Sequence, residues 1–237
     1  MKYLKTFESH SNNYFDLDFS KIETTDTRGY SAILDILKYK ELDLQEFLND
    51  VRFNLLQFGL ITKSTNFKLI GTGQYGIAFS FYDKVLKVTT SKKEFDTSYE
   101  FIDIEYEGAV RYYLSFQYLD LPIWIIIQDK LEPLPKMERD IYTTLYYLGA
   151  NDMDNPEFEF SSVEELISGL QKRLRNPEPE DELQSYDIRK RDLREYFRKY
   201  SELRDKLMVN GISVDDLHGE NIGLKDGELV HFDIMKV

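Results

Sequence analysis

The stretch that decides the fold is FKLIGTGQYGIAFSFYDKVLKV, residues 67–88. It holds three short runs of β-branched and aromatic residues, separated by a glycine-rich segment and by an Asp-Lys turn. Runs of this length between turn residues are typical of adjacent antiparallel strands. We therefore predict a small antiparallel sheet, with strands over Phe67–Ile70, Ile77–Tyr82 and Val85–Val88.

The segment between the first two strands reads G-x-G-x-x-G, and its residues are Gly71, Thr72, Gly73, Gln74, Tyr75 and Gly76. In a dinucleotide-binding fold this motif opens a helix, whose N-terminus receives the pyrophosphate. Here it runs into a strand-like segment, so we predict a loop between antiparallel strands. Because glycine has no Cβ, such a loop can fold its backbone N–H groups over a polyphosphate. An ordinary glycine-rich β-turn is the alternative interpretation.

Lys87 lies between apolar neighbours on the third predicted strand. From there its ammonium group would point at whatever the glycine loop covers and pair with phosphate oxygens. A solvent-exposed strand lysine is the alternative interpretation. A buried lysine needs an anionic partner, and we predict a helix from about Tyr99 to Phe116 that carries Glu105 and Glu107. We favour Glu107, although the helical period does not decide between the two.

The most specific cluster is VDDLHGEN, residues 214–221. Asp216 stands five residues before Asn221, and an Asp-Gly pair at 226–227 separates the two short apolar segments that follow. Such a pair predicts a hairpin, which brings Asn221 and Asp233 to the same open end. Two oxygen ligands there suit Mg²⁺, and Asp216 is placed to accept a proton from an attacking hydroxyl. Acidic turn and cap residues are the alternative interpretation.

The rest of the chain is mainly helical in pattern. Residues 1–29 show no sustained period, and we expect a loosely structured lead-in there. An Ile-rich run that begins at Trp124 predicts a buried strand. Apolar residues at three- and four-residue steps predict helices, two before Gly59 and others over Met137–Leu148, Val163–Leu174 and residues 183–209. Helices with two separate β regions make an α+β fold.

Composition excludes several classes of protein. The 237 residues include 43 acidic and 30 basic side chains, a net charge of -13, 42% hydrophobic residues and no cysteine. Such a chain is too apolar for a disordered protein and has no disulfide framework. The negative charge argues against nucleic acid as a partner. The apolar runs are too short to span a bilayer and there is no signal-peptide pattern, so we expect no membrane association and a cytoplasmic location.

Taken in order, these motifs resemble the elements of a protein-kinase-like fold. The form Asp216-Leu217-His218-Gly219-Glu220-Asn221 is closest to the Asp-x-His-x-x-Asn loop of aminoglycoside-phosphotransferase-like kinases. The resemblance covers roughly residues 67–237 and implies two lobes, a small antiparallel-sheet N-lobe and a reduced helical C-lobe. The domain boundaries that we expect are 1–60 for a lead-in and helical extension, 61–132 for the N-lobe and 133–237 for the C-lobe.

The same resemblance implies roles in binding ATP. Gly71, Gly73 and Gly76 would cover the phosphates, and Lys87 would contact the α- and β-phosphates while Glu107 holds it. Residues Asp129 to Leu131 would form the hinge whose backbone receives the adenine.

It implies roles in catalysis as well. Asp216 would be the catalytic base, Asn221 and Asp233 would bind Mg²⁺, and His218 would support the loop. The expected function is transfer of the γ-phosphate of Mg-ATP to a hydroxyl on a protein or a small molecule.

The departures from the family pattern keep two other functions open. Val214 and Asp215 replace the His-Arg of kinases, Ile234 and Met235 replace the Phe-Gly after the metal-binding Asp, and few residues follow. A conventional platform for a peptide substrate is therefore not expected. The alternatives are a pseudokinase that binds a nucleotide or a protein, and a nucleotidyl transferase that carries out AMPylation. Compact kinase-like chains of this kind resemble phage and bacterial proteins, which would place a phage-encoded protein in the host cytoplasm.

Overall fold

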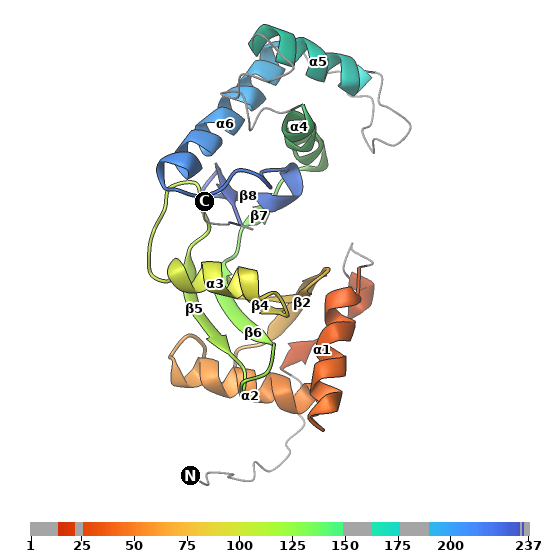
Figure 1. Ribbon diagram of the computed structural model, residues 1–237, viewed down its shortest axis with the longest axis vertical. Helices are drawn as coiled ribbons and strands as arrows, with labels where there is room; N and C mark the ends of the chain where they lie inside the picture. Colours follow the sequence, from red (N-terminus) through yellow and green to blue (C-terminus); the bar gives the residue numbers. More distant parts are fainter. Residues whose placement is uncertain (1–13, 22–25, 149–162, 176–189, 233, 235–237) are drawn as a thin grey trace. The chain divides into compact units, whose positions relative to one another are not determined.

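A computed structural model describes residues 14–21, 26–148, 163–175, 190–232 and 234. It confirms the α+β class, because helices accompany two separate sheets (Figure 1). The chain divides into two compact units. The first unit comprises residues 1–92 and 116–127, and the second comprises residues 93–115 and 128–237. The two predicted N-terminal helices thus belong to the same unit as the glycine loop.

Two helices open the first unit, as predicted. They are α1 (Arg28–Tyr39) and α2 (Leu44–Gln57), and α1 packs against the sheet (Figure 1). The side chain of Asp43 caps α2 by accepting hydrogen bonds from the backbone N–H groups of Gln45 and Glu46, at 2.7 and 3.2 Å.

The predicted meander is confirmed as three antiparallel strands of the larger sheet. They are β2 (Phe67–Thr72), β3 (Gly76–Phe81) and β4 (Lys84–Thr89). The order in this sheet is β1-β2-β3-β4-β6-β5, with β1 (Phe15–Asp16), β5 (Tyr112–Gln117) and β6 (Trp124–Asp129). The predicted buried strand is therefore confirmed as β6, whose six residues are all buried.

The loosely structured lead-in is wrong at Phe15. This residue pairs with Phe67 in the parallel strand β1, is completely buried, and stacks on the Phe67 ring at 4.4 Å. A 3-10 helix, η1 (Phe19–Lys21), follows it. The strand is only two residues long, so it leaves no alternating pattern in the sequence.

The helix predicted from Tyr99 to Phe116 is also wrong. The helix α3 spans Lys92–Glu100, and β5 already begins at Tyr112. Between them Asp103 and Gly108 have φ of 60° and 83°, a left-handed conformation that breaks a helix.

The second unit contains the three predicted C-terminal helices. They are α4 (Lys136–Tyr147), α5 (Val163–Arg175) and α6 (Lys190–Val209), and α4 and α5 both pack against α6 (Figure 1). The predicted start of the last helix, residues 183–189, lies outside the described residues. Between α4 and α6, the ring of Tyr142 stacks on that of Tyr200, with the ring centroids 6.1 Å apart.

The predicted C-terminal hairpin is confirmed. A small sheet joins β7 (Glu132–Pro133), β8 (Ile222–Lys225) and β9 (Glu228–His231) in that order. Asp226 and Gly227 have φ of 54° and 82°, which is the type I′ turn that matches the twist of a two-residue hairpin. At the open end, the backbone N–H of Phe232 donates to the carbonyl of Asn221 at 3.0 Å.

Candidate functional site

The glycine motif forms the predicted loop between two antiparallel strands. The backbone N–H of Gly73 donates to the carbonyl of Gly76 at 3.0 Å and closes the turn. The carbonyl of Tyr75 accepts from the backbone N–H of Thr90 at 2.7 Å, which ties the turn to the end of β4. Within the described residues, the backbone N–H groups of Gln74 and Tyr75 donate no hydrogen bond. The turn therefore offers two adjacent backbone donors.

The physical need for glycine differs among the three glycines of the motif. A Cβ on Gly76 would lie 2.0 Å from the carbonyl oxygen of Val88, so close packing against β4 requires glycine there. A Cβ on Gly71 or Gly73 would meet no atom within 4 Å, and neither residue has a positive φ. Neither packing nor backbone conformation requires glycine at these two positions.

The first turn of α1 lies directly on the glycine loop. The backbone N–H of Gly29 donates to the carbonyl of Gly73 at 2.9 Å, and a Cβ on Gly29 would lie 1.9 Å from the backbone nitrogen of Gly76. Sequence reasoning missed this contact, because a single glycine in the first turn of a helix carries no signal of what it packs against.

Lys87 lies on β4, half-buried and opposite Ala78 of β3. Its expected partner is not on a helix. Glu107 lies in the loop after α3 and forms an ion pair with Lys206 of α6 at 2.8 Å, while Glu105 pairs with Arg111 at 3.0 Å. The helical placement of both carboxylates was wrong because the helix ends at Glu100.

The acidic residues that do lie on α3 were missed. They are Glu94, Asp96 and Glu100, and Glu94 is half-buried in the first turn. The predicted helix began at Tyr99, seven residues after the start of α3, so it did not include Glu94 or Asp96.

The predicted hinge begins with Asp129, whose carboxylate and backbone N–H are already engaged. The side chain of Asp129 accepts from the Tyr113 hydroxyl at 2.7 Å and forms an ion pair with Lys225. Its backbone N–H donates to the carbonyl of Arg111 at 3.0 Å. Asp129 therefore has no free N–H for an adenine. Leu131 packs on Gly223, and its part in a hinge stays a prediction.

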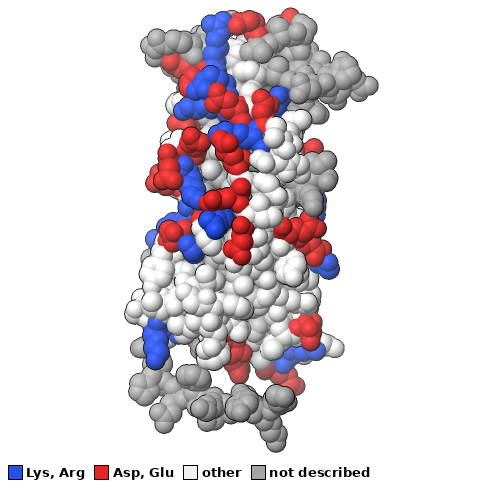
Figure 2. Space-filling model, turned by 90° about the vertical axis from the view of Figure 1, so that its left-hand side faces the viewer, with Lys and Arg blue, Asp and Glu red and all other residues white. Residues whose placement is uncertain are grey.

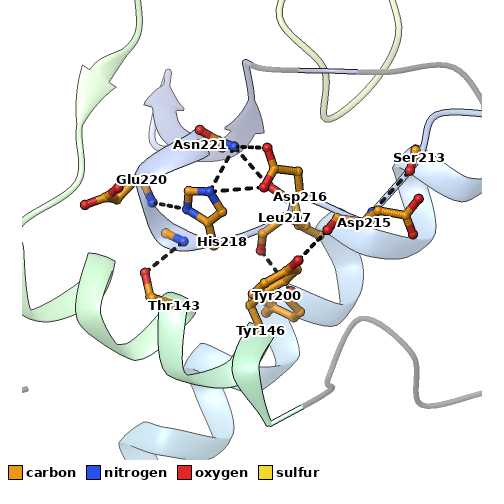
Figure 3. Close-up of polar contacts among 11 residues, drawn as sticks. Thr143, Tyr146, Tyr200, Ser213, Asp215, Asp216, Leu217, His218, Glu220 and Asn221 are labelled. Carbon is orange, nitrogen blue, oxygen red and sulfur yellow. Dashed lines mark hydrogen bonds and ion pairs between the residues drawn. The ribbon is translucent and has the colours of Figure 1, made fainter. Parts of the chain in front are cut away.

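The loop that precedes β8 brings Asp216, His218 and Asn221 together (Figure 3). The side-chain nitrogen Nδ2 of Asn221 donates to Oδ2 of Asp216 at 2.8 Å, and Nε2 of His218 lies 3.2 Å from Oδ1 of the same carboxylate. The side chain of Asp216 is 41% exposed. Each of its oxygens keeps a lone pair for a further donor such as an acceptor hydroxyl.

The bonding pattern defines the tautomer of His218. Its Nδ1 accepts a hydrogen bond from the backbone N–H of Glu220 at 3.3 Å, so the proton of the neutral ring is on Nε2. Nε2 lies 3.2 Å from both Oδ1 of Asp216 and Nδ2 of Asn221. The two hydrogens on Nδ2 of Asn221 are donated to the backbone carbonyl and to Oδ2 of Asp216. Nε2–H of His218 therefore donates to the carboxylate of Asp216. His218 thereby supports the loop as a donor to Asp216.

Gly219 allows this loop to approach α4. A Cβ on Gly219 would lie 2.0 Å from the carbonyl oxygen of Arg139, and its backbone N–H donates to Oγ1 of Thr143 at 3.1 Å. A glycine between His218 and Asn221 is therefore a requirement of the packing of the second unit.

Of the two predicted metal ligands, Asn221 lies within the described residues. Because Nδ2 of Asn221 faces Asp216, its amide oxygen is left for a cation, and this oxygen suits Mg²⁺. Asp233 lies outside the described residues. In the ranges that the structure covers, no group of three or more His, Cys, Asp or Glu side chains converges on a point that would hold a metal.

The surface charge is mixed. On the face shown in Figure 2, basic side chains are interspersed with acidic ones, and ion pairs such as Arg194 with Glu164 and Arg198 with Glu195 belong to α6 and its neighbour. Among the helices described here, none has the length and apolar character needed to cross a membrane.

The chain was compared with protein-family models and with curated proteins, and neither comparison gave a match. The resemblance to the kinase-like fold therefore stays a hypothesis that rests on the residues described above.

Proposed function

We propose that the protein has a kinase-like fold and transfers the γ-phosphate of Mg-ATP to a hydroxyl group of a protein or a small molecule. The observation that carries the proposal is the hydrogen-bonded set of Asp216, His218 and Asn221. A half-exposed carboxylate held by two side-chain donors has a defined direction, which is what a general base for phosphoryl transfer needs.

The first unit supplies supporting features. The turn of the glycine loop has two backbone N–H groups that donate no bond to other described residues, and Gly71 and Gly73 leave open space. Backbone N–H groups of this kind bind phosphate oxygens. Lys87 lies on β4, which pairs with the strand that follows the glycine loop, and would supply a positive charge for phosphate.

In the proposed reaction the acceptor oxygen attacks the γ-phosphorus while its proton passes to the carboxylate of Asp216. A bond forms between that oxygen and phosphorus, and the bond from phosphorus to the β–γ bridging oxygen breaks, so that ADP leaves. Asn221 would hold Mg²⁺ through its amide oxygen, and Asp233 is its proposed second ligand. When bound, the cation would neutralise phosphate charge.

Replacing the carboxylate tests this assignment. Asp216→Ala should lower ATP turnover with Mg²⁺ at least about 100-fold, because a positioned base contributes 10²–10⁴-fold to such reactions. Binding of ATP, measured by calorimetry, should be retained. The matched control is Asp215→Ala, because this neighbour engages Tyr146 and Ser213 through its backbone.

An Asp216→Ala protein as active as the parent would rule out the proposed base. A parent that binds ATP without turning it over would indicate the pseudokinase alternative.

A further inference from the structure

Three consecutive carbonyl groups, those of Asp215, Asp216 and Leu217, accept hydrogen bonds from side chains of α4, of α6 and of the short 3-10 helix η3 (Gly219–Asn221) (Figure 3). The Tyr146 hydroxyl, from α4, donates to the carbonyl of Asp215, and the Tyr200 hydroxyl, from α6, donates to that of Leu217 at 2.9 Å. Between them, Nδ2 of Asn221 donates to the carbonyl of Asp216 at 3.1 Å. The peptide planes on both sides of Asp216 are therefore held in place.

The hydroxyl donors are suited to this task at neutral pH. Tyr200 and Leu217 are completely buried. Burial raises the pKa of Tyr200 above its ordinary value, and burial, followed by the negative charge of Asp216, does the same for the pKa of Tyr146. Both phenols consequently stay protonated and able to donate.

We infer that Tyr200, Tyr146 and Thr143 are positioning residues that hold the backbone of residues 215–219 and thereby aim the carboxylate of Asp216. Thr143 acts by accepting the hydrogen bond from the backbone N–H of Gly219. This inference rests on the proposed function, in which Asp216 is the base. A displacement of about 1 Å in a reacting group can lower a rate by about 100-fold, so the position of this backbone has a direct effect on catalysis.

The chain contains a matched control for Tyr200. Tyr142 is equally buried, lies on the facing helix α4 and stacks on Tyr200. Its hydroxyl has no hydrogen-bond partner among the described residues. Tyr200→Phe and Tyr142→Phe therefore each remove one buried hydroxyl from this stacked pair. Only Tyr200→Phe also removes a hydrogen bond to the loop that carries Asp216.

The kinetic test compares these two variants of the full chain. Tyr200→Phe should lower the kcat of ATP turnover by about 10- to 100-fold with the KM for ATP within about twofold, because the base moves while the glycine loop is unchanged. Tyr142→Phe should keep the parent's kcat. Equal kcat values for the parent and both variants would overturn the inference.

A second comparison keeps the test valid if Tyr200→Phe does not fold. Thr143→Val removes the acceptor for Gly219, whereas Thr143→Ser retains a hydroxyl. Thr143→Val should lower kcat and Thr143→Ser should restore most of it. A Thr143→Ser variant as impaired as Thr143→Val would contradict a role for the hydrogen bond.

NMR of the His218 ring nitrogens gives a readout that does not depend on activity. Their signals should shift in Tyr200→Phe, because the bond from Nε2 to Asp216 changes, and should match the parent in Tyr142→Phe. Unchanged signals in both variants would reject the inference. Shifted signals in a protein that shows no ATP turnover would instead reject the proposed function and support the positioning of the loop.

Discussion

Asp129 shows how single side chains hold the second unit together. Its carboxylate is almost completely buried, and two donors bond it, the Tyr113 hydroxyl on β5 and the Lys225 ammonium group on β8. Isolated buried charges are costly, so this carboxylate depends on its partners. The residue that the sequence suggested for adenine recognition thus connects three strands.

Removing the ammonium group of Lys225 tests this structural role of Asp129. Lys225→Met should lower the free energy of unfolding by about 1–3 kcal/mol, less than for a fully buried pair because the Lys225 side chain is 41% exposed. In the double variant with Asp129→Asn the loss should be smaller than the sum of the single losses. Urea denaturation measures the free energy of unfolding of the single and double variants. Lys172→Met, on the exposed face of α5, is the control. A Lys225→Met protein as stable as the parent would contradict the account of this pair.

At the scale of elements, α1 and the glycine loop form one structure. The bond from Gly29 to Gly73 and the absence of a side chain on Gly29 place the helix against the backbone of the turn. The carbonyl of Gly73 is therefore engaged by α1, while the N–H groups of Gln74 and Tyr75 donate no hydrogen bond to other described residues. We expect the helix to fix the conformation in which the loop presents them.

A methyl group on Gly29 should disturb this contact. Helix propensity alone predicts that Gly29→Ala stabilises the protein by about 0.5–1 kcal/mol. The overlap with the backbone of Gly76 outweighs this, and we expect the free energy of unfolding to fall by about 1–3 kcal/mol. Amide exchange should become faster at Gly73, whose N–H closes the turn on the carbonyl of Gly76. Ser31→Ala, on the exposed face of the same helix, is the control. Slower exchange at Gly73 in Gly29→Ala than in the parent would show that helix propensity outweighs the overlap with Gly76.

Local patterns were enough to predict some elements. The hairpin at Asp226-Gly227 follows from turn chemistry, and the meander follows from short apolar runs between turns. The sequence could not predict β1, because Phe15 is held by distant partners such as Phe67. It also misplaced α3, because the left-handed conformations of Asp103 and Gly108 end a pattern that looks helical.

The same distinction applies to the candidate site. Asp216, His218 and Asn221 were found because their spacing is local, and the structure brings them together. The actual partner of Glu107 is Lys206, about a hundred residues away in sequence, and no local pattern indicates it. The hydroxyls of Tyr146 and Tyr200 were missed for the same reason, since ordinary buried tyrosines of helices give the same apolar stripe.

At the scale of the whole molecule, buried tyrosines make the stability of the fold depend on pH. Burial raises the pKa of Tyr118, Tyr142 and Tyr200 above the ordinary value. A group whose pKa is raised on folding contributes stability that is present below its unfolded pKa, about 10 for tyrosine, and is lost as the pH rises above it. The phenols favour folding at neutral pH and oppose it in alkali.

These tyrosines should therefore leave the free energy of unfolding nearly level between about pH 7 and pH 9 and lower it above about pH 10, by up to about 1.4 kcal/mol per pH unit for each buried tyrosine. Tyr142→Phe should fall less steeply, because one such phenol is absent. Denaturant unfolding at a series of pH values, followed by circular dichroism, measures the two slopes. Identical slopes for the parent and the variant would contradict this origin of the alkaline sensitivity.

Phosphoryl transfer is tested most directly by incubating the full chain and a cell lysate with Mg²⁺ and ATP labelled either on the γ-phosphate or on the α-phosphate. We expect the γ label on an acceptor, dependent on Asp216, and no α label on any acceptor. Transfer of the α label would identify a nucleotidyl transferase instead. Transfer of neither label by a protein that binds ATP would contradict catalysis by Asp216.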